Sequence, residues 1–303
     1  MEEEIKEKYL KAGKILEKAI ELARVNAKEG TKFLELAEEV ENFIIEKKAK
    51  PAFPVNLSKN NIAAHYTPKE NDNEKISKDD VVKIDIGVCV DGYIADAAFT
   101  INLSNKWKNL IHAANEALKN AIEIANVGKK ISEIGRIIEE TIKKHGFKPV
   151  YNLSGHGLAY FEAHTEPNIP NYDNKSTVVL EENCAYAIEP FSSNGKGFIH
   201  EGATSNIYKL IEKKPVRSAI SRKILDEIEE NFATLPFAER WLKDVSEFEK
   251  RRALKELIMH KCIKQFNILL EKPSTLISQA ETSIIFDKSR KYILVDLDKI
   301  IED

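Results

Sequence analysis

Apolar side chains recur along the chain with two different periods, and the change between them outlines its organisation. Helical spacing marks four amphipathic segments: residues 3–25, 32–48, 105–126 and 131–145. Gly30 separates the first two segments, and Gly146 ends the last one. Between the two helical pairs, residues 81–100 alternate with the period of two that is typical of β-strands. A helix pair, a strand region and a second helix pair are therefore predicted in that order.

The C-terminal half of the chain is more mixed. Residues 147–211 read as short strands and loops, whereas residues 216–265 are rich in Lys and Glu, lack Gly and are predicted to be helical except around Pro236. Residues 268–303 alternate like strands again. Residues 50–58 contain two prolines, so we expect extended chain and a turn there. The pattern predicts the α+β class, with a helical block set into the C-terminal half.

The run "VVKIDIGVCVDGYIADAAFT" at residues 81–100 predicts a hairpin that carries two carboxylates. Asp91-Gly92 between alternating apolar runs is a strong signal for a two-residue turn. With this turn, Asp85 and Asp96 become diagonal neighbours on one face of the hairpin, roughly 7–8 Å apart at the backbone. Their side chains can therefore converge on one ion. The alternative is that each acid lies on a half-solvated sheet and pairs with a Lys.

Two further acids stand inside apolar, strand-like runs. Glu189 lies in "CAYAIEPFS" and Glu281 in "STLISQAETSIIF". An acid in such a place is costly unless it is paired or bound to metal. Four carboxylates carry about four negative charges, which two divalent cations would neutralise, and one neutral imidazole could complete the site. His156 and His164, eight residues apart in "NLSGHGLAYFEAHTEPNIP", are the candidates.

Composition excludes several classes of function. The net charge of −3 gives no reason to expect a nucleic-acid or anionic-membrane surface. No apolar run approaches the roughly 18 residues of a membrane span, and we expect no signal peptide. The three cysteines, Cys89, Cys184 and Cys262, are widely spaced and odd in number, which fits free thiols in a reducing cytosol. We therefore expect a cytoplasmic protein with no nucleic-acid or membrane partner.

Taken together, the motifs resemble the methionine aminopeptidases, in the short archaeal form of type II. The stretches that fit in order and spacing are "FPVNLSKNNIAAHYTP", "KIDIGVCVDGYIADAAFT", "NLSGHG", "AIEPF" and "TLPFAERWL". The type II assignment rests on the separation of 92 positions from Glu189 to Glu281, which holds the helical block. The resemblance implies the pita-bread α+β fold, a pseudo-symmetric curved antiparallel sheet flanked by helices. It also implies one catalytic domain over 1–303, with a helical insertion at 212–266.

The resemblance further implies roles for individual residues. The metal ligands of the family fall on Asp85, Asp96, His156, Glu189 and Glu281. The catalytic residues fall on Glu189 as the proton acceptor, His164 as donor to the scissile carbonyl and His65 near the substrate N-terminus. The positions that bind the methionine, besides those two histidines, fall on Phe53, Pro54, Asn56, Ala163 and Phe191.

The same resemblance implies the reaction, the cofactor and the partners. We expect removal of the initiator methionine from nascent polypeptides whose second residue is small, by a monomeric enzyme with two divalent ions of Co, Mn, Fe, Ni or Zn. Ribosome docking is left open. One alternative is an Xaa-Pro aminopeptidase or dipeptidase, and the other is a non-catalytic binding protein on the same fold.

Some residues depart from the family pattern or carry no motif. "QAETS" places Ala280 and Thr282 beside Glu281, where the family has Phe and His. Cys89 shares the strand face of Asp85, so it either lines the rim of the metal cavity or is a small buried hydrophobe. The remaining histidines are interpreted as structural or solvated: His112, His145, His200 and His260.

Overall fold

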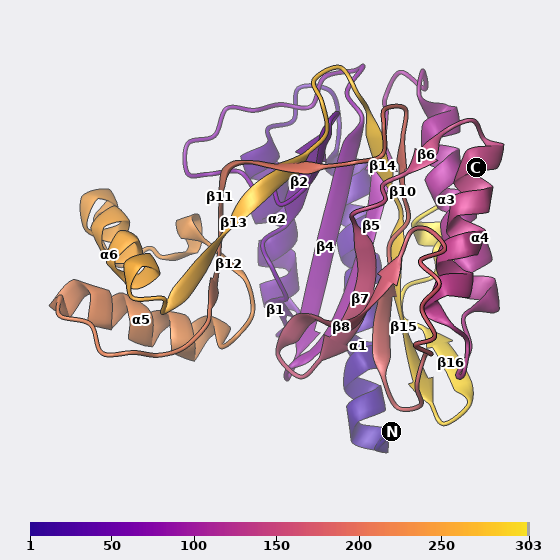
Figure 1. Cartoon of the computed structure of the whole chain (residues 1–303). Helices are drawn as coiled ribbons and strands as arrows, with labels where there is room; N and C mark the ends of the chain where they lie inside the picture. The colour runs from indigo at the N-terminus through magenta and orange to yellow at the C-terminus, as the bar shows by residue number, and fades with distance from the viewer. Residues whose placement is uncertain (302–303) are drawn as a thin grey trace.

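A nine-stranded antiparallel sheet forms the centre of the computed structural model, which describes residues 1–301 (Figure 1). Its strand order is β1-β4-β5-β15-β9-β7-β8, with β2 paired to β4 and β16 paired to β15. These strands are β1 (Lys50–Pro51), β2 (Asn56–Lys59), β4 (Val82–Val90), β5 (Tyr93–Ile101), β7 (Ser154–Ala159), β8 (Glu162–Pro170), β9 (Ala185–Ile188), β15 (Glu281–Asp287) and β16 (Arg290–Ile293).

Two smaller antiparallel sheets accompany the large one. The first has the order β14-β10-β6 and the second β12-β11-β13-β3. Their strands are β3 (Ile62–Ala64), β6 (Lys148–Pro149), β10 (Phe191–Ser193), β11 (His200–Leu210), β12 (Phe237–Ala238), β13 (Ile263–Leu270) and β14 (Ile277–Gln279). The helical segments are α1 (Glu3–Asn26), α2 (Phe33–Glu46), α3 (Lys108–Ile124), α4 (Ile131–Lys144), α5 (Ala219–Phe232), α6 (Glu247–Met259), η1 (Glu239–Trp241) and η2 (Leu297–Lys299).

The large sheet has two similar halves that meet at β15. In each half a helix pair precedes antiparallel strands of this sheet: α1 and α2 come before β1, β2, β4 and β5, and α3 and α4 come before β7, β8 and β9. β15 pairs with β5 of the first half and with β9 of the second. The apolar faces of the helices pack on the sheet, and their side chains form one continuous core with those of the strands. This is the expected pita-bread α+β fold, curved around its centre.

The hairpin predicted at residues 81–100 is confirmed in its turn and its register. β4 and β5 pair so that Val90 faces Tyr93 across the turn and Gly87 faces Asp96. Asp91 has φ 48° and Gly92 has φ 90°, the left-handed conformation that a two-residue hairpin turn of this kind requires at both positions. The two halves of this hairpin therefore present the same faces that the alternation of the sequence predicts.

A second, smaller hydrophobic core lies apart from the main one. It is built on α5, α6 and the adjoining ends of β11, β12 and β13, and Figure 1 shows these elements projecting from the edge of the large sheet. Its buried side chains include Leu225, Phe237 and Leu257. The helical prediction for 216–265 is wrong at its C-terminal end, because 263–265 begin strand β13, whose pairing with β11 overrides the local pattern. That this block is an insertion at 212–266 of a single domain stays a prediction.

A buried ion pair links this block to the rest of the fold. Arg240 of η1 donates to Glu41 of α2, and Trp241 Nε1 donates to the other Glu41 oxygen at 2.8 Å. The backbone N–H of Val55 also donates to Glu41, at 3.0 Å. Burial raises the pKa of Glu41, and the charge of Arg240 opposes that shift. Glu41 thus joins three segments that are distant in sequence.

None of the helices within residues 1–301 combines the length and the apolar character needed to cross a bilayer.

Replacing Glu41 by Gln should destabilise the fold strongly, because Arg240 would stay buried without its counter-charge. We expect the free energy of unfolding to fall by about 3–5 kcal/mol. Denaturant titration followed by circular dichroism measures this change. Glu46→Gln on the exposed side of the same helix is the matched control. Equal midpoints for the two variants would show that the buried pair contributes no net stability.

Candidate metal centre

Strand register brings four carboxylates to one face of the large sheet. Asp85 and Glu281 are both paired with Ala98, from opposite sides, so their side chains lie on the same face. Asp96 shares that face because it stands two residues before Ala98 on β5. The small Ala98 side chain leaves the space between the acids open. The central position of β15 is therefore what joins Glu281 to the predicted hairpin pair.

The second half of the sheet adds the remaining two residues by the same logic. β15 pairs with β9 so that Thr282 faces Ile188, and the next position in this register sets Glu281 beside Glu189. His156 on β7 pairs with Ala187, which shares the strand face of Glu189 two residues later. Five residues predicted to bind metal are thus gathered at the centre of the sheet. We call Asp85, Asp96, His156, Glu189 and Glu281 the carboxylate centre.

Short distances confirm that these side chains converge. His156 Nε2 lies 4.0 Å from Asp96 Oδ2 and 3.8 Å from Glu189 Oε1. Asp96, His156 and Glu281 each offer a ligand atom, and these atoms all lie within 4.8 Å of one another. All three residues are buried, whereas Asp85 and Glu189 are partly buried.

His156 is held as a neutral imidazole with its Nε2 toward the acids. Its Nδ1 lies 3.1 Å from the carbonyl oxygen of Gly157, which can only accept, so Nδ1 carries the proton. Burial, and in second place the nearby His164, lowers the pKa of His156 to about 3. The Nε2 lone pair is therefore free to bind a cation.

The carboxylates perturb one another strongly. Burial raises the pKa of Asp85 to about 7. Burial also raises the pKa of Asp96, Glu189 and Glu281 well above their ordinary values, and the negative charge of neighbouring acids adds to each shift. Within residues 1–301, no Lys or Arg nitrogen lies within 4.0 Å of any of the four. The protein alone leaves this charge without compensation.

The donor atoms fit a divalent cation. Asp85 Oδ1 and Asp96 Oδ1 are buried without a hydrogen-bond partner, and such orphan oxygens are what a bound ion would satisfy. Oxygen ligands with a single imidazole suit Mn, Fe or Co at least as well as Zn. The set differs from structural zinc sites, in which Cys and His predominate.

Gln279 belongs to the centre but was not among the predicted site residues. Its amide Nε2 donates to Glu281 Oε2 at 3.0 Å and to Glu189 Oε2 at 3.4 Å. Period-two alternation places Gln279 on the strand-like run two residues before Glu281, and this signal could have revealed it. The amide orients two carboxylates without neutralising them, as outer-shell partners of metal sites do.

The two histidines assigned to substrate binding lie in different settings. The ring of His164 stacks on His156 with centroids 4.3 Å apart, and the residue is exposed. His65 Nδ1 donates to the carbonyl of Asn267 at 3.1 Å, and its ring packs edge-on against Phe266. Burial lowers the pKa of His65 to about 4, so this imidazole is neutral with Nε2 unprotonated.

The residues predicted to line a methionine pocket fall into two groups. Asn56 is paired with Asp85 on the neighbouring strand, and its Oδ1 is buried without a partner. Phe53 covers Gly87, where a Cβ would stand 2.4 Å from the Phe53 ring. Phe53 and Ala163 adjoin the main core and Pro54 is buried, whereas Phe191 packs in a separate small cluster with Ala63, Val150 and Ile277. Their role in binding methionine stays a prediction.

Cys89 is buried, so of its two alternatives the rim of the metal cavity is wrong. It lies on the predicted strand face, but it is only 1 % exposed and packs in the main core. Burial raises the pKa of its thiol to about 11. Cys89 does line a cavity of about 860 Å³ near Phe161 and Trp241, but among the described residues that lining contains none of the carboxylate centre. Phe53, packed over Gly87, stands between the two.

Comparison with known proteins agrees with this geometry. The sequence profile of metallopeptidase family M24 matches residues 7–226. The chain belongs to metallopeptidase family M24. It is 45% identical to a methionine aminopeptidase of Archaeoglobus fulgidus over 95% of its own length and 97% of that protein. As a member of a metallopeptidase family, it uses divalent metal, which the carboxylate centre is suited to bind.

Solved structures confirm the pita-bread fold. A thermophilic Arx1 has a TM-score of 0.84 with 18% identity, covering 100% of this chain and 95% of that one. A methionine aminopeptidase from Thermotoga maritima has a TM-score of 0.68 with 21% identity, covering 97% of both chains. At these identities the likeness establishes the fold and leaves activity to the site residues.

Metal removal should make the stability of this M24 protein depend on pH. The folded pKa of Asp85, about 7, exceeds its ordinary 3.8, so the metal-free protein loses stability as pH rises between these values. A bound cation favours the ionised form and removes this loss. The difference in Tm between Mn²⁺-loaded and EDTA-treated protein should therefore be larger at pH 8 than at pH 5.5, by at least about 5 °C.

Ionisable groups outside the carboxylate centre change stability equally in both samples, so taking the difference cancels their contribution. Asp85→Asn serves as the matched variant, since it removes one of the charges, and its difference should vary less with pH. A loaded-minus-chelated difference that is the same at both pH values would contradict the presence of a cation among these carboxylates.

Proposed function

We propose that the chain is a metal-dependent methionine aminopeptidase that removes the initiator methionine from nascent proteins when the second residue is small. The observation that carries this proposal is the carboxylate centre, which gathers four acids and one neutral imidazole without a basic partner in the described residues. Identity of 45–46% over 95% of the chain to archaeal proteins named methionine aminopeptidase supports the same conclusion.

The assignment of ligands follows the position of each residue. Asp96 and Glu281 are the more deeply buried of the four acids and adjoin the other members, so they would be shared by two ions. Asp85 would complete the ligands of one ion, and His156 with Glu189 those of the other. Two divalent ions balance four carboxylates, and Co, Mn, Fe, Ni or Zn can occupy such a site. When bound, the metal pair supplies a water of lowered pKa and polarises the scissile carbonyl.

The surrounding side chains then position the peptide and move protons. Glu189, whose pKa burial raises, accepts a proton from the attacking water and delivers it to the leaving amine. His164 is exposed beside His156 and donates a hydrogen bond to the carbonyl oxygen as charge develops there. The imidazole of His65 is neutral, with Nε2 unprotonated, and this nitrogen accepts a hydrogen bond from the N-terminal part of the substrate.

The remaining assignments concern substrate specificity, domain organisation, cellular location and oligomeric state. Phe53, Pro54, Asn56, Ala163 and Phe191 contribute to the methionine pocket, where aromatic and apolar walls suit a thioether. The block at 212–266 is an insertion in one catalytic domain that spans 1–303. The protein acts in the cytoplasm as a monomer on nascent polypeptides that begin with Met.

Cleavage of short peptides tests this function directly. With Mn²⁺ or Co²⁺, Met-Ala-Ser should be hydrolysed at least about 10-fold faster, by kcat/KM, than Met-Lys-Ser or Leu-Ala-Ser. Met-Lys-Ser probes exclusion of a long second residue, and Leu-Ala-Ser probes the pocket for methionine. Liquid chromatography of the released amino acid measures each rate.

Glu281→Gln is the matched control, since it keeps the shape of a proposed bridging ligand but removes its charge. It should lower turnover by about three orders of magnitude or more, as the loss of a catalytic metal does. Comparable rates for Leu-Ala-Ser and Met-Ala-Ser would indicate a broad aminopeptidase. Preference for Xaa-Pro peptides would indicate a dipeptidase-like enzyme, and metal binding without any cleavage would indicate a binding protein.

A further inference from the structure

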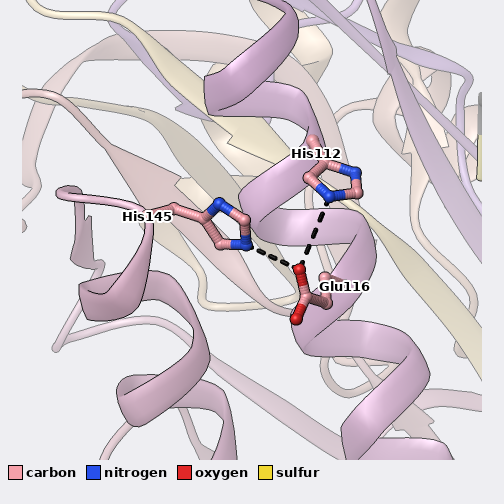
Figure 2. Close-up of side chains that lie close together, drawn as sticks. All are labelled: His112, Glu116 and His145. Atoms are coloured by element: carbon pink, nitrogen blue, oxygen red, sulfur yellow. Dashed lines mark hydrogen bonds and ion pairs between the residues drawn. The ribbon is translucent and has the colours of Figure 1, made fainter.

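Two histidines that carry no sequence motif meet at one glutamate on the helical layer. His112 and Glu116 stand one turn apart on α3, and His145 caps the C-terminus of α4 (Figure 2). His112 and His145 are 33 positions apart in sequence, and the antiparallel packing of α3 against α4 brings them together. None of the three belongs to the carboxylate centre.

The two imidazoles point to the same oxygen atom. His145 Nε2 lies 2.6 Å from Glu116 Oε2, and His112 Nε2 lies 3.4 Å from it. The rings meet edge to face with centroids 5.1 Å apart. A tetrahedral zinc site with bonds of about 2.0–2.1 Å places its ligand atoms about 3.3 Å apart. The 3.4 Å distance from His112 Nε2 is already close to this value, and the 2.6 Å distance from His145 Nε2 needs less than 1 Å of opening.

The setting of the three side chains also suits an ion. The side chain of His112 is 52% exposed, while Glu116 and His145 are 27% and 21% exposed, so solvent can deliver an ion and complete its coordination. The negative end of the α4 dipole favours a cation at His145. Lys144 is also charged, and its Nζ lies 3.6 Å from Glu116 Oε1, which leaves Oε2 to the imidazoles.

An ordinary ion pair does not require this arrangement. One protonated imidazole would pair with Glu116 fully, and the second imidazole, at 3.4 Å from the same oxygen, adds little to that pair. Two imidazoles and a carboxylate with all ligand atoms within 4.8 Å are, by contrast, the three protein ligands of a familiar class of zinc site. A pair of residues four apart on one helix and a third from a neighbouring helix fix such a geometry.

We propose that His112, Glu116 and His145 form a surface site for one divalent transition-metal ion of the Zn²⁺ class, which cross-links α3 and α4. Two nitrogen ligands and one oxygen ligand select Zn²⁺, Ni²⁺ or Cu²⁺ over Mn²⁺ and Mg²⁺. The carboxylate centre offers mostly oxygen, which suits Mn, Fe or Co at least as well as Zn. The two sites therefore differ in their relative preference among divalent metals.

The cross-link acts on an element that supports the centre. The carbonyl of Leu110, in the first turn of α3, accepts a hydrogen bond of 2.6 Å from Ser192 Oγ on β10. β10 begins two residues after Glu189. An ion at His112 would hold this turn against α4 and should therefore raise the thermal stability of the protein.

Zn²⁺ binding to the full-length protein tests the proposal. Equilibrium dialysis at pH 7.5 should count one Zn²⁺ fewer, at micromolar free metal, in His112→Asn and in His145→Asn than in the unmodified chain. The affinity of this site should fall at least about 100-fold, at or beyond the upper end of what loss of an outer-shell partner causes. His260→Asn, at an exposed histidine after α6, is the matched control and should bind as the unmodified chain does.

A spectroscopic readout identifies the ligands independently of stoichiometry. Cu²⁺ bound at the surface site should show electron paramagnetic resonance coupling to two imidazole nitrogens, reduced to one in each histidine variant. The five residues of the carboxylate centre include one imidazole, that of His156, so a two-nitrogen signal that is lost in His112→Asn and in His145→Asn must come from the surface site. Glu116→Gln keeps both imidazoles and the helix contact, so it should weaken Zn²⁺ binding while keeping the two-nitrogen spectrum.

Cleavage of methionine peptides separates this proposal from the aminopeptidase function. The variants His112→Asn, His145→Asn and Glu116→Gln should all retain this activity whether or not they bind Zn²⁺ at the surface site. Equal Zn²⁺ counts in His112→Asn, His145→Asn and His260→Asn would overturn the surface site. A single-nitrogen Cu²⁺ spectrum in the unmodified chain would do the same.

Discussion

Mutual repulsion among carboxylates at the centre of the sheet is the constraint on which the rest of the structure depends. Two other buried acids of the protein, Glu41 and Glu271, have several hydrogen-bond donors around them. Glu41 has Arg240, Trp241 and a backbone N–H. Glu271 has the Ser193 hydroxyl at 2.6 Å and two backbone N–H groups, those of Lys196 and Gly197. Within residues 1–301 the carboxylate centre has the Gln279 amide but no Lys or Arg partner, so its charge must be balanced from outside.

The fold keeps these acids together by register rather than by attraction. Ala98 is paired with Asp85 on one side and with Glu281 on the other. Backbone hydrogen bonds hold the three strands together although the carboxylate side chains repel one another. The buried network around Glu41 ties the α5–α6 block to the strand that begins at Asn56, beside Asp85. A metal-free centre is thus strained electrostatically but held in shape, which is the preorganisation that catalysis by bound metal needs.

Local signals in the sequence were sufficient to predict the structure where strands that are adjacent in the chain pair with each other. Asp91-Gly92 and the alternation around it predicted the β4–β5 register residue by residue, including the shared face of Asp85 and Asp96. Burial of Cys89 was not decided by that register, because Phe53 from another segment covers the strand between Cys89 and the acids. Strand β13 also begins earlier than its sequence indicates, since its partner β11 lies over 50 residues away.

Long-range placement needed either the family resemblance or the structure itself. Glu189 and Glu281 stand in unrelated runs, and only the position of β15 between β5 and β9 makes them neighbours. His112, Glu116 and His145 carried no signal, because their contact depends on how α3 and α4 pack. The Phe191 cluster, with residues from three other segments, is of the same kind.

Anomalous diffraction from crystals of the Mn²⁺-loaded protein tests the central claim most directly. The account predicts two anomalous peaks among the four carboxylates, both contacted by Asp96 and Glu281. One peak should also be contacted by Asp85, and the other by His156 and Glu189. Absence of any peak between these residues, with Mn²⁺ in excess and the acids in the same positions, would contradict the account.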